Sequence, residues 1–210
     1  RIPRASTLVP QMFAFLGPQI AEGTYKVRLT KVDKVYDGAV AALPDPRADY
    51  TAEGKALQDK LVMELYDLLG RLTFMVDGLL DLETKVKERI EKAGPAAPVA
   101  ARLKEFGDSI EALRKTIVAT RKGGFLAGEE RLREKLGDLY GAVNGYEGSP
   151  TKSQVDYAKV LAAQLDEANQ KVDAAAGAPL DALNAALKAA GLEPIARLTK
   201  AEWDAKQTGQ

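Results

Sequence analysis

Apolar residues recur with the period of a helix along residues 51–92, TAEGKALQDKLVMELYDLLGRLTFMVDGLLDLETKVKERIEK. Thr51 suits the N-cap position, and the nearby Asp49 suits the positive start of a helix. A single helix of this length would be roughly 60 Å long, at 1.5 Å per residue. The recurring positions lie mostly three and four residues apart: Leu57, Leu61, Leu65, Leu68, Leu72, Val76, Leu79, Val86 and Ile90. This spacing predicts one long amphipathic helix that organises the fold.

Three glycines interrupt this predicted helix: Gly54, Gly70 and Gly78. Each glycine costs about 1 kcal/mol of helix stability relative to alanine. A long helix that keeps small residues at these points favours close packing of a neighbour over a kink. We therefore expect another segment to approach the helix at all three glycines.

Four further amphipathic segments follow the breaker Gly94–Pro98. The first has apolar residues that alternate at steps of four and three, which is typical of a bundle partner: Val99, Leu103, Phe106, Ile110, Leu113 and Ile117. It is expected to end at Lys122–Gly124, and the next helix to run from about Gly128 to Asn144. Thr151 and Gln154 form a capping-box signature for another helix. A short last helix is predicted from Pro179 to Gly191.

The segment before the helices has the alternation of β-structure. Apolar and polar residues alternate over Tyr25–Thr30, and Val35–Leu43 can return as a second strand, with Gly38 as a bulge. A two-stranded hairpin is marginal in water on its own. We therefore expect it either to pack on the helices or to be the last strands of an Ig- or fibronectin-like sandwich that begins upstream.

These patterns predict a mainly α fold: an antiparallel bundle of four main helices plus a short fifth, preceded by a small β segment. The predicted units are a β segment over 1–48, a helical bundle over 49–193 and a C-terminal tail over 194–210. The tail holds Trp203, the one tryptophan, and is expected to fray unless that ring docks.

The composition excludes several function classes. The chain has no histidine and no cysteine, which removes the usual nucleophilic, acid–base and metal-binding groups. Thirty basic residues balance thirty acidic ones, so nothing marks a nucleic-acid binder. No apolar run approaches the roughly 20 residues that span a bilayer. We predict no catalytic, cofactor-binding or metal-ligating residue, and no membrane span.

An acidic cluster raises the question of a metal site, but the available residues do not favour one. Asp77 and Asp81 lie four residues apart on one helix face, with Glu83 close by. Carboxylate-bridged metal bundles also need histidine ligands, which this chain lacks. A solvated acidic face is the better interpretation. Asp33 and Asp37 flank a turn and match no calcium loop.

A basic stretch and a glycine-rich loop are also weak signals. Arg114, Lys115, Arg121 and Lys122 have acidic neighbours and no interleaved aromatic residues, which favours a solvated helix end. The loop Lys122–Gly128 lacks the Gly-Lys-Ser/Thr ending of a phosphate-binding loop.

Two passages carry a family resemblance. One is GPQIAEGTYKVRL at 17–29 with PDPR at 44–47, and the other is LGDLYGAVNG at 136–145 with SPT at 149–151. They resemble the C-terminal region of large bacterial BNR-repeat proteins with sortilin-like β-propellers, which are often labelled glycosyl hydrolases. The resemblance spans about Gly17 to Leu192. It implies the end of a small β-domain followed by a helical bundle, in an extracellular, periplasmic or cell-envelope setting.

The resemblance carries over no catalytic residues, because a hydrolase site would belong to the propeller. The chain begins at Arg1, and we expect it to be part of a longer protein. The first hypothesis is a non-catalytic C-terminal module that docks on its own upstream propeller or on another protein.

Two alternatives stay open. The first is an accessory carbohydrate-contacting module of the hydrolase, since sugar sites use aromatic platforms and paired carboxylates. The second is a self-associating bundle, a homo-oligomer zipped along the 99–117 seam. Among the candidate platforms, Tyr140 and Tyr157 have core-like spacing, and Tyr146 and Trp203 are expected to be free; the full set is Tyr36, Tyr50, Tyr140, Tyr146, Tyr157 and Trp203.

Overall fold

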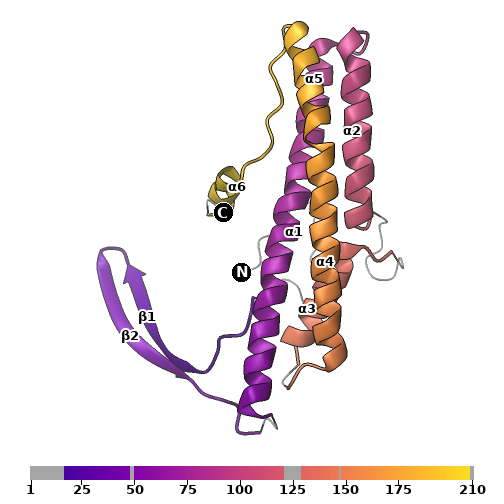
Figure 1. Ribbon diagram of the computed structural model, residues 1–210. Coiled ribbons are helices and arrows are strands. Elements are labelled where there is room, and N and C mark those ends of the chain that lie inside the picture. Colours follow the sequence, from indigo (N-terminus) through magenta and orange to yellow (C-terminus); the bar gives the residue numbers. More distant parts are fainter. Residues whose placement is uncertain (1–16, 48–49, 121–128, 147, 209–210) are drawn as a thin grey trace.

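The computed structural model describes residues 17–47, 50–120, 129–146 and 148–208. Two strands come first and helices follow, so the predicted mainly α fold with a small preceding β segment is confirmed (Figure 1). The elements are β1 (Gly23–Lys31), β2 (Lys34–Ala42), α1 (Ala52–Ala93), α2 (Pro98–Ile117), α3 (Leu132–Asn144), α4 (Lys152–Ala175), α5 (Ala178–Ala189) and α6 (Lys200–Thr208).

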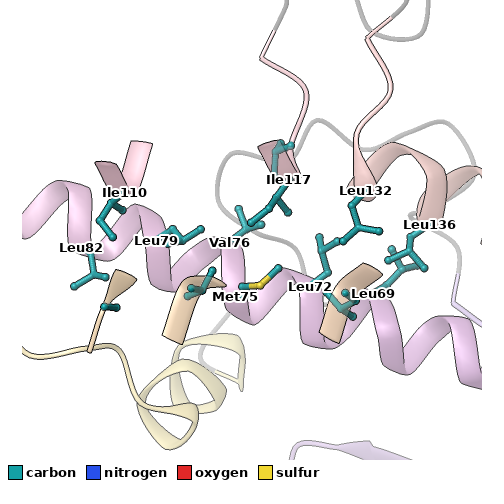
Figure 2. Close-up of a cluster of buried hydrophobic side chains, with 14 of the residues drawn as sticks. Leu69, Leu72, Met75, Val76, Leu79, Leu82, Ile110, Ile117, Leu132 and Leu136 are labelled. Atoms are coloured by element: carbon teal, nitrogen blue, oxygen red, sulfur yellow. The ribbon is translucent and has the colours of Figure 1, made fainter. Parts of the chain in front are cut away.

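The helices α1 to α5 stack in three rows along one another. The helix α1 is the first row, and it contacts α2, α3 and α4. The second row consists of α2 and α3 placed end to end: Ile117 of α2 lies over Val76 of α1, and Leu132 of α3 lies over Leu72 (Figure 2). The third row is α4 continued by α5 (Figure 1). Two shorter helices thus match the full length of α1.

The core follows the periodic positions that the sequence predicts except at Leu57, which is 43% exposed. Along α1 the buried side chains recur within about one turn of each other, and α2, α3 and α4 each contribute a matching stripe. Burial of one such side chain contributes about 1.5–3 kcal/mol. The fully buried apolar residues include Leu65, Leu72, Leu79, Leu103, Ile110, Leu136, Tyr140, Leu161, Leu165 and Leu187. This shared core holds the three rows together.

The predicted helix caps are confirmed. The Gly54 amide donates to Thr51 Oγ1 over 3.1 Å at the start of α1. Before α4, the Thr151 amide donates to Gln154 Oε1 over 2.8 Å, and the Gln154 amide donates back to Thr151 Oγ1 over 3.2 Å. Gly191, with φ +72°, follows α5. The helix α2 ends at Ile117, before the predicted Lys122–Gly124, and α3 begins at Leu132, after the predicted Gly128, so both predicted bounds are wrong; residues 121–128 themselves lie outside the described residues.

The prediction of close packing at the α1 glycines is right at one of the three. A Cβ at Gly54 would collide with Ser149 Oγ in the α3–α4 connection. A Cβ at Gly70 or Gly78 would meet nothing within 4 Å, so the prediction is wrong there. The difference lies in position around the helix: Gly70 lines an open groove between α1, α4 and α6.

The C-terminal tail docks on α1 through α6. The Trp203 ring is 4% exposed and meets Phe74 of α1 edge to face, with 5.6 Å between centroids. Its indole N–H donates to Asp77 Oδ2 over 2.8 Å, and Lys200 Nζ lies 4.3 Å from its centroid. The chain before α6 is tied down by a 2.9 Å hydrogen bond from Arg89 to the Glu193 carbonyl.

Candidate functional site

The hairpin of β1 and β2 has an unbroken antiparallel register, from Gly23 opposite Ala42 to Lys31 opposite Lys34. Gly38 pairs directly with Val27, so the predicted bulge is wrong: two strands of equal length joined by a two-residue turn leave no extra residue to accommodate. Because side chains alternate across a strand, the pairs sort onto two faces. We call the first the apolar face, and its pairs are Tyr25–Val40, Val27–Gly38 and Leu29–Tyr36.

The apolar face is uncovered. Leu29 is 61% exposed, Tyr36 is 53% exposed and Val40 is 50% exposed. Figure 1 shows the ribbon projecting away from the helices, so of the two expected arrangements the packing on the helices is not found, and the upstream sandwich stays a prediction. A contiguous exposed apolar surface of this kind marks an interaction site. The hairpin face is therefore the candidate functional site of the chain.

The turn at the tip adds to the exposed apolar surface. Val32 is 86% exposed and has φ +54°. A β-branched residue rarely adopts this left-handed conformation, which costs roughly 1–2 kcal/mol. The tip thus keeps a strained valine where glycine would be relaxed.

The base of the hairpin is fixed to the bundle by two amide side chains. The backbone N–H of Gln19 donates to Asn144 Oδ1 over 3.4 Å, and the Gln19 side-chain Nε2 donates to the backbone carbonyl of Asn144 over 3.2 Å. Asn144 Nδ2 in turn donates to the Gly17 carbonyl over 3.3 Å. Sequence reasoning missed this link, because no local pattern connects residues so far apart along the chain. Asn144 is buried at the end of α3, so the stem has a rigid support.

The exit from the hairpin is also ordered. The Arg47 amide and guanidinium both donate to the Asp45 carboxylate, over 2.9 Å from the backbone nitrogen. These bonds, the side-chain one first, lower the pKa of Asp45. Farther along the chain, Thr51 caps the start of α1.

The opposite face of the hairpin is polar. Arg28 Nε and Nη2 donate to the two carboxylate oxygens of Asp37, over 2.7 and 3.1 Å. This cross-strand pair engages one of the two carboxylates considered for calcium, and Asp33 lies in the turn. Lys26 adds a positive charge to this face, whereas Lys31, opposite Lys34, lies on the apolar face at its turn end.

The acidic cluster of α1 does not converge on a common point. Asp77 accepts from Trp203, and Asp81 pairs with Lys85 over 2.6 Å. Glu83 is buried and pairs with Arg114 of α2 over 2.6 Å. The predicted solvated face is therefore wrong for Glu83, because α2 covers it and supplies its counter-ion. In the described ranges, no group of three or more carboxylates could hold a metal ion.

The basic stretch separates in the same way. Arg114 is largely buried in its pair with Glu83, which corrects the prediction of a solvated helix end at that residue. Lys115 is half exposed and pairs with Glu111 of its own helix over 2.9 Å. Arg121, Lys122 and the loop Lys122–Gly128 lie outside the described residues.

The aromatic candidates divide differently from the prediction. Tyr140 is in the core and Tyr146 is exposed, as predicted. Tyr157 is exposed rather than buried, and Trp203 is buried rather than free. A groove of about 510 Å³ beside α6 is lined by Tyr66, Phe74 and Trp203. Lys200 lies over the Trp203 ring, so that ring offers no open stacking platform.

No family model matches the chain, and the searches of curated proteins and of solved structures also give no match. Across the described residues, every helix falls short of the combined length and apolar character that a bilayer crossing demands. The functional interpretation therefore depends on the residues themselves, together with the resemblance in the two passages at 17–47 and 136–151.

Proposed function

We propose that this chain is a non-catalytic structural and interaction module of a larger exported β-propeller protein. The helical bundle acts as a rigid support, and the hairpin docks on a partner, which is the protein's own upstream region. The observation that carries the proposal is the apolar face of the hairpin, with Leu29, Tyr36 and Val40 each at least half exposed.

Docking would supply the third strand or covering layer that the hairpin lacks. A two-stranded ribbon without a third strand or a covering layer is marginal in water. Gln19 and Asn144 hold its base on the bundle, and Arg47 bonds to Asp45 within the exit segment. A surface already held in place loses less conformational entropy on binding, so this arrangement favours an interface. An upstream β-domain would present the apolar sheet face that such a ribbon packs against.

The exported setting and the propeller parent rest on the resemblance of residues 17–47 and 136–151 to the BNR-repeat proteins. Fractionation of the source cells, with mass spectrometry of peptides from this region, tests them. A species much larger than the 22.6 kDa chain in the envelope or secreted fraction supports the proposal. A free species of that size in the cytosol contradicts it.

Two alternatives have less support. For a carbohydrate-contacting role, the buried Trp203 is no longer a candidate platform, and the exposed Tyr36, Tyr146 and Tyr157 remain. A glycan-dependent rise in melting temperature would revive it. Self-association along α2 is not supported, since the seam residues Leu103, Phe106 and Ile110 are buried inside the bundle and offer no exposed surface to a second copy.

The docking proposal is tested with the polypeptide encoded directly upstream of Arg1. Purified chain and upstream polypeptide are mixed, and their affinity is measured by calorimetry. Val40→Lys should weaken binding by at least about tenfold, because burying an unpaired ammonium is costly. Val160→Lys on α4 is the matched control, since Val160 is 49% exposed and Val40 is 50% exposed. Absence of binding by the unaltered chain, or equal losses in the two variants, would contradict the proposal.

A further inference from the structure

We infer that the partner adds a β-strand to the outer edge of β2, and that the outer edge of β1 stays unpaired. The inference rests on the proposed function and specifies how the hairpin docks. In the described residues the sheet has two strands, so each strand has one edge whose backbone N–H and C=O groups are unpaired in the sheet. Such an edge is a template for another strand unless something protects it.

The two edges differ in charge. The strand β1 carries Lys26, Arg28 and Lys31, and charged side chains, lysine above all, are the usual protection of an edge. The strand β2 carries Lys34 at its start and Asp37, and Asp37 is paired with Arg28 of the neighbouring strand, so residues 38–42 carry no charge. Neither strand contains proline, and the register has no bulge. The β2 edge is therefore the less protected one, above all along residues 38–42.

The side chains along the two edges also differ in size. The second half of β2 is Gly38-Ala39-Val40-Ala41-Ala42, so small side chains let another backbone approach closely. Gly38 lies on the apolar face between Tyr36 and Val40, and a Cβ there would meet nothing within 4 Å. A bulky apolar side chain from an added strand can fill this hollow. Packing of this kind over a sheet glycine stabilises strand pairing.

The polar face indicates the rest of the partner's chemistry. Lys26 lies opposite Ala39, whose methyl group leaves the space beyond it open. A lysine side chain can extend over alanine toward a neighbouring strand, where opposite charges on one face stabilise pairing. The occupant is therefore an extended segment with apolar residues at alternate positions and an acidic residue on its polar side.

Two cross-strand pairs allow matched variants. Thr24 is opposite Ala41, and Thr30 is opposite Val35, all on the polar face. Ala41→Lys and Val35→Lys add a charge on the β2 side, while Thr24→Lys and Thr30→Lys add the same charge to the same pairs on the β1 side. The probe is the upstream polypeptide. The β2 variants should weaken its binding by about tenfold or more, and the β1 variants by less than about twofold.

Amide hydrogen exchange provides an independent measurement. The outward amides of β2 should exchange quickly in the free chain and slowly in the complex, and those of β1 quickly in both. Equal losses for the two sets of variants, larger losses on the β1 side, or protection of β2 in the free chain would each overturn the inference while leaving docking intact. Loss of a chain dimer in Ala41→Lys would identify a second copy as the occupant and overturn it too. No binding of the probe to the unaltered chain overturns both proposals.

Discussion

The helical bundle and the hairpin both carry an apolar stripe, and only the bundle covers it. Leu79 of α1 is fully buried, whereas Leu29 of β1 is 61% exposed. The stripe of α1 meets α2, α3 and α4, which the same chain supplies. The hairpin projects away from the helices (Figure 1). An apolar pattern thus shows which face suits a cover, and among the described residues the chain itself covers only the stripe of the bundle.

The largest test of this contrast compares two leucines. Leu79→Ala should lower the free energy of unfolding by about 3 kcal/mol, because it removes buried methyl groups and leaves a cavity. Leu29→Ala should leave the stability of the isolated chain unchanged. Urea unfolding followed by far-UV circular dichroism measures both. A comparable loss in Leu29→Ala would mean that the hairpin face is covered in solution.

The second test compares two arginine–carboxylate pairs of similar geometry. Arg114 and Glu83 lie 2.6 Å apart with side chains 18% and 11% exposed, and Arg28 and Asp37 lie 2.7 Å apart with side chains 68% and 62% exposed. Arg114→Met should cost about 2 kcal/mol, because it leaves a buried carboxylate without its counter-ion.

Arg28→Met is the control for the ion pairs, and it should not move the urea midpoint, because solvent screens an exposed pair. Adding Glu83→Gln to Arg114→Met should recover part of the loss by removing the stranded charge. If the single and double variants are equally unstable, the buried pair acts through packing rather than charge.

A tyrosine of the core gives the third test. Burial, with a further contribution from Tyr66, raises the pKa of Tyr140 to about 12 from its ordinary 10.0. Between these pH values the unfolded chain releases a proton that the folded chain keeps, so stability falls as pH rises from 10 to 12. The loss should reach about 2 kcal/mol at pH 12. Tyr140→Phe should flatten this part of the curve of unfolding free energy against pH, and an unchanged slope would contradict the assignment.

The smallest expected effect concerns the docking of α6 on α1. In the extent of its contacts, α6 is intermediate between the helical bundle and the hairpin. Phe74→Ala removes the edge-to-face partner of Trp203, a contact worth about 1 kcal/mol beyond its area. Because Trp203 is the one tryptophan, its fluorescence should shift to longer wavelength while the helical signal of the bundle persists. Tyr146→Ala, at an exposed aromatic residue, should leave the emission unchanged. A blue emission maximum in Phe74→Ala would mean that the hydrogen bond to Asp77 holds α6 by itself.

Periodicity predicted the helices and the hairpin because it reports the local geometry of side chains. Thr51 and Gln154 could be placed for the same reason, since a cap depends on a few neighbouring residues. The identity of what covers a face depends on the rest of the chain, and the sequence pattern did not reveal it. Gly54 and Gly70 are alike in sequence, yet Ser149 approaches only the first.

The predictions of which aromatic residues are exposed were partly wrong for a related reason. Trp203 follows Pro194 in a polar tail, and nothing near it in the sequence indicates that it contacts Phe74 and Asp77 on the distant helix α1. The link between Gln19 and Asn144 is equally distant. The hairpin could be predicted as an element, but its exposure, which makes it the candidate site, is a property of the assembled molecule.

The continuity of α1 has a mechanical consequence. A pull on the hairpin reaches the first turn of α1 through residues 43–51, and α1 runs unbroken to Ala93 beside α2, α3 and α4. The load is therefore shared in shear over many contacts, and forced unfolding rates depend on the barrier to breaking them together. A pull on the C-terminus instead peels α6 from α1 starting at its end, one contact after another. The bundle should therefore resist tension applied through its hairpin better than tension applied through its C-terminus.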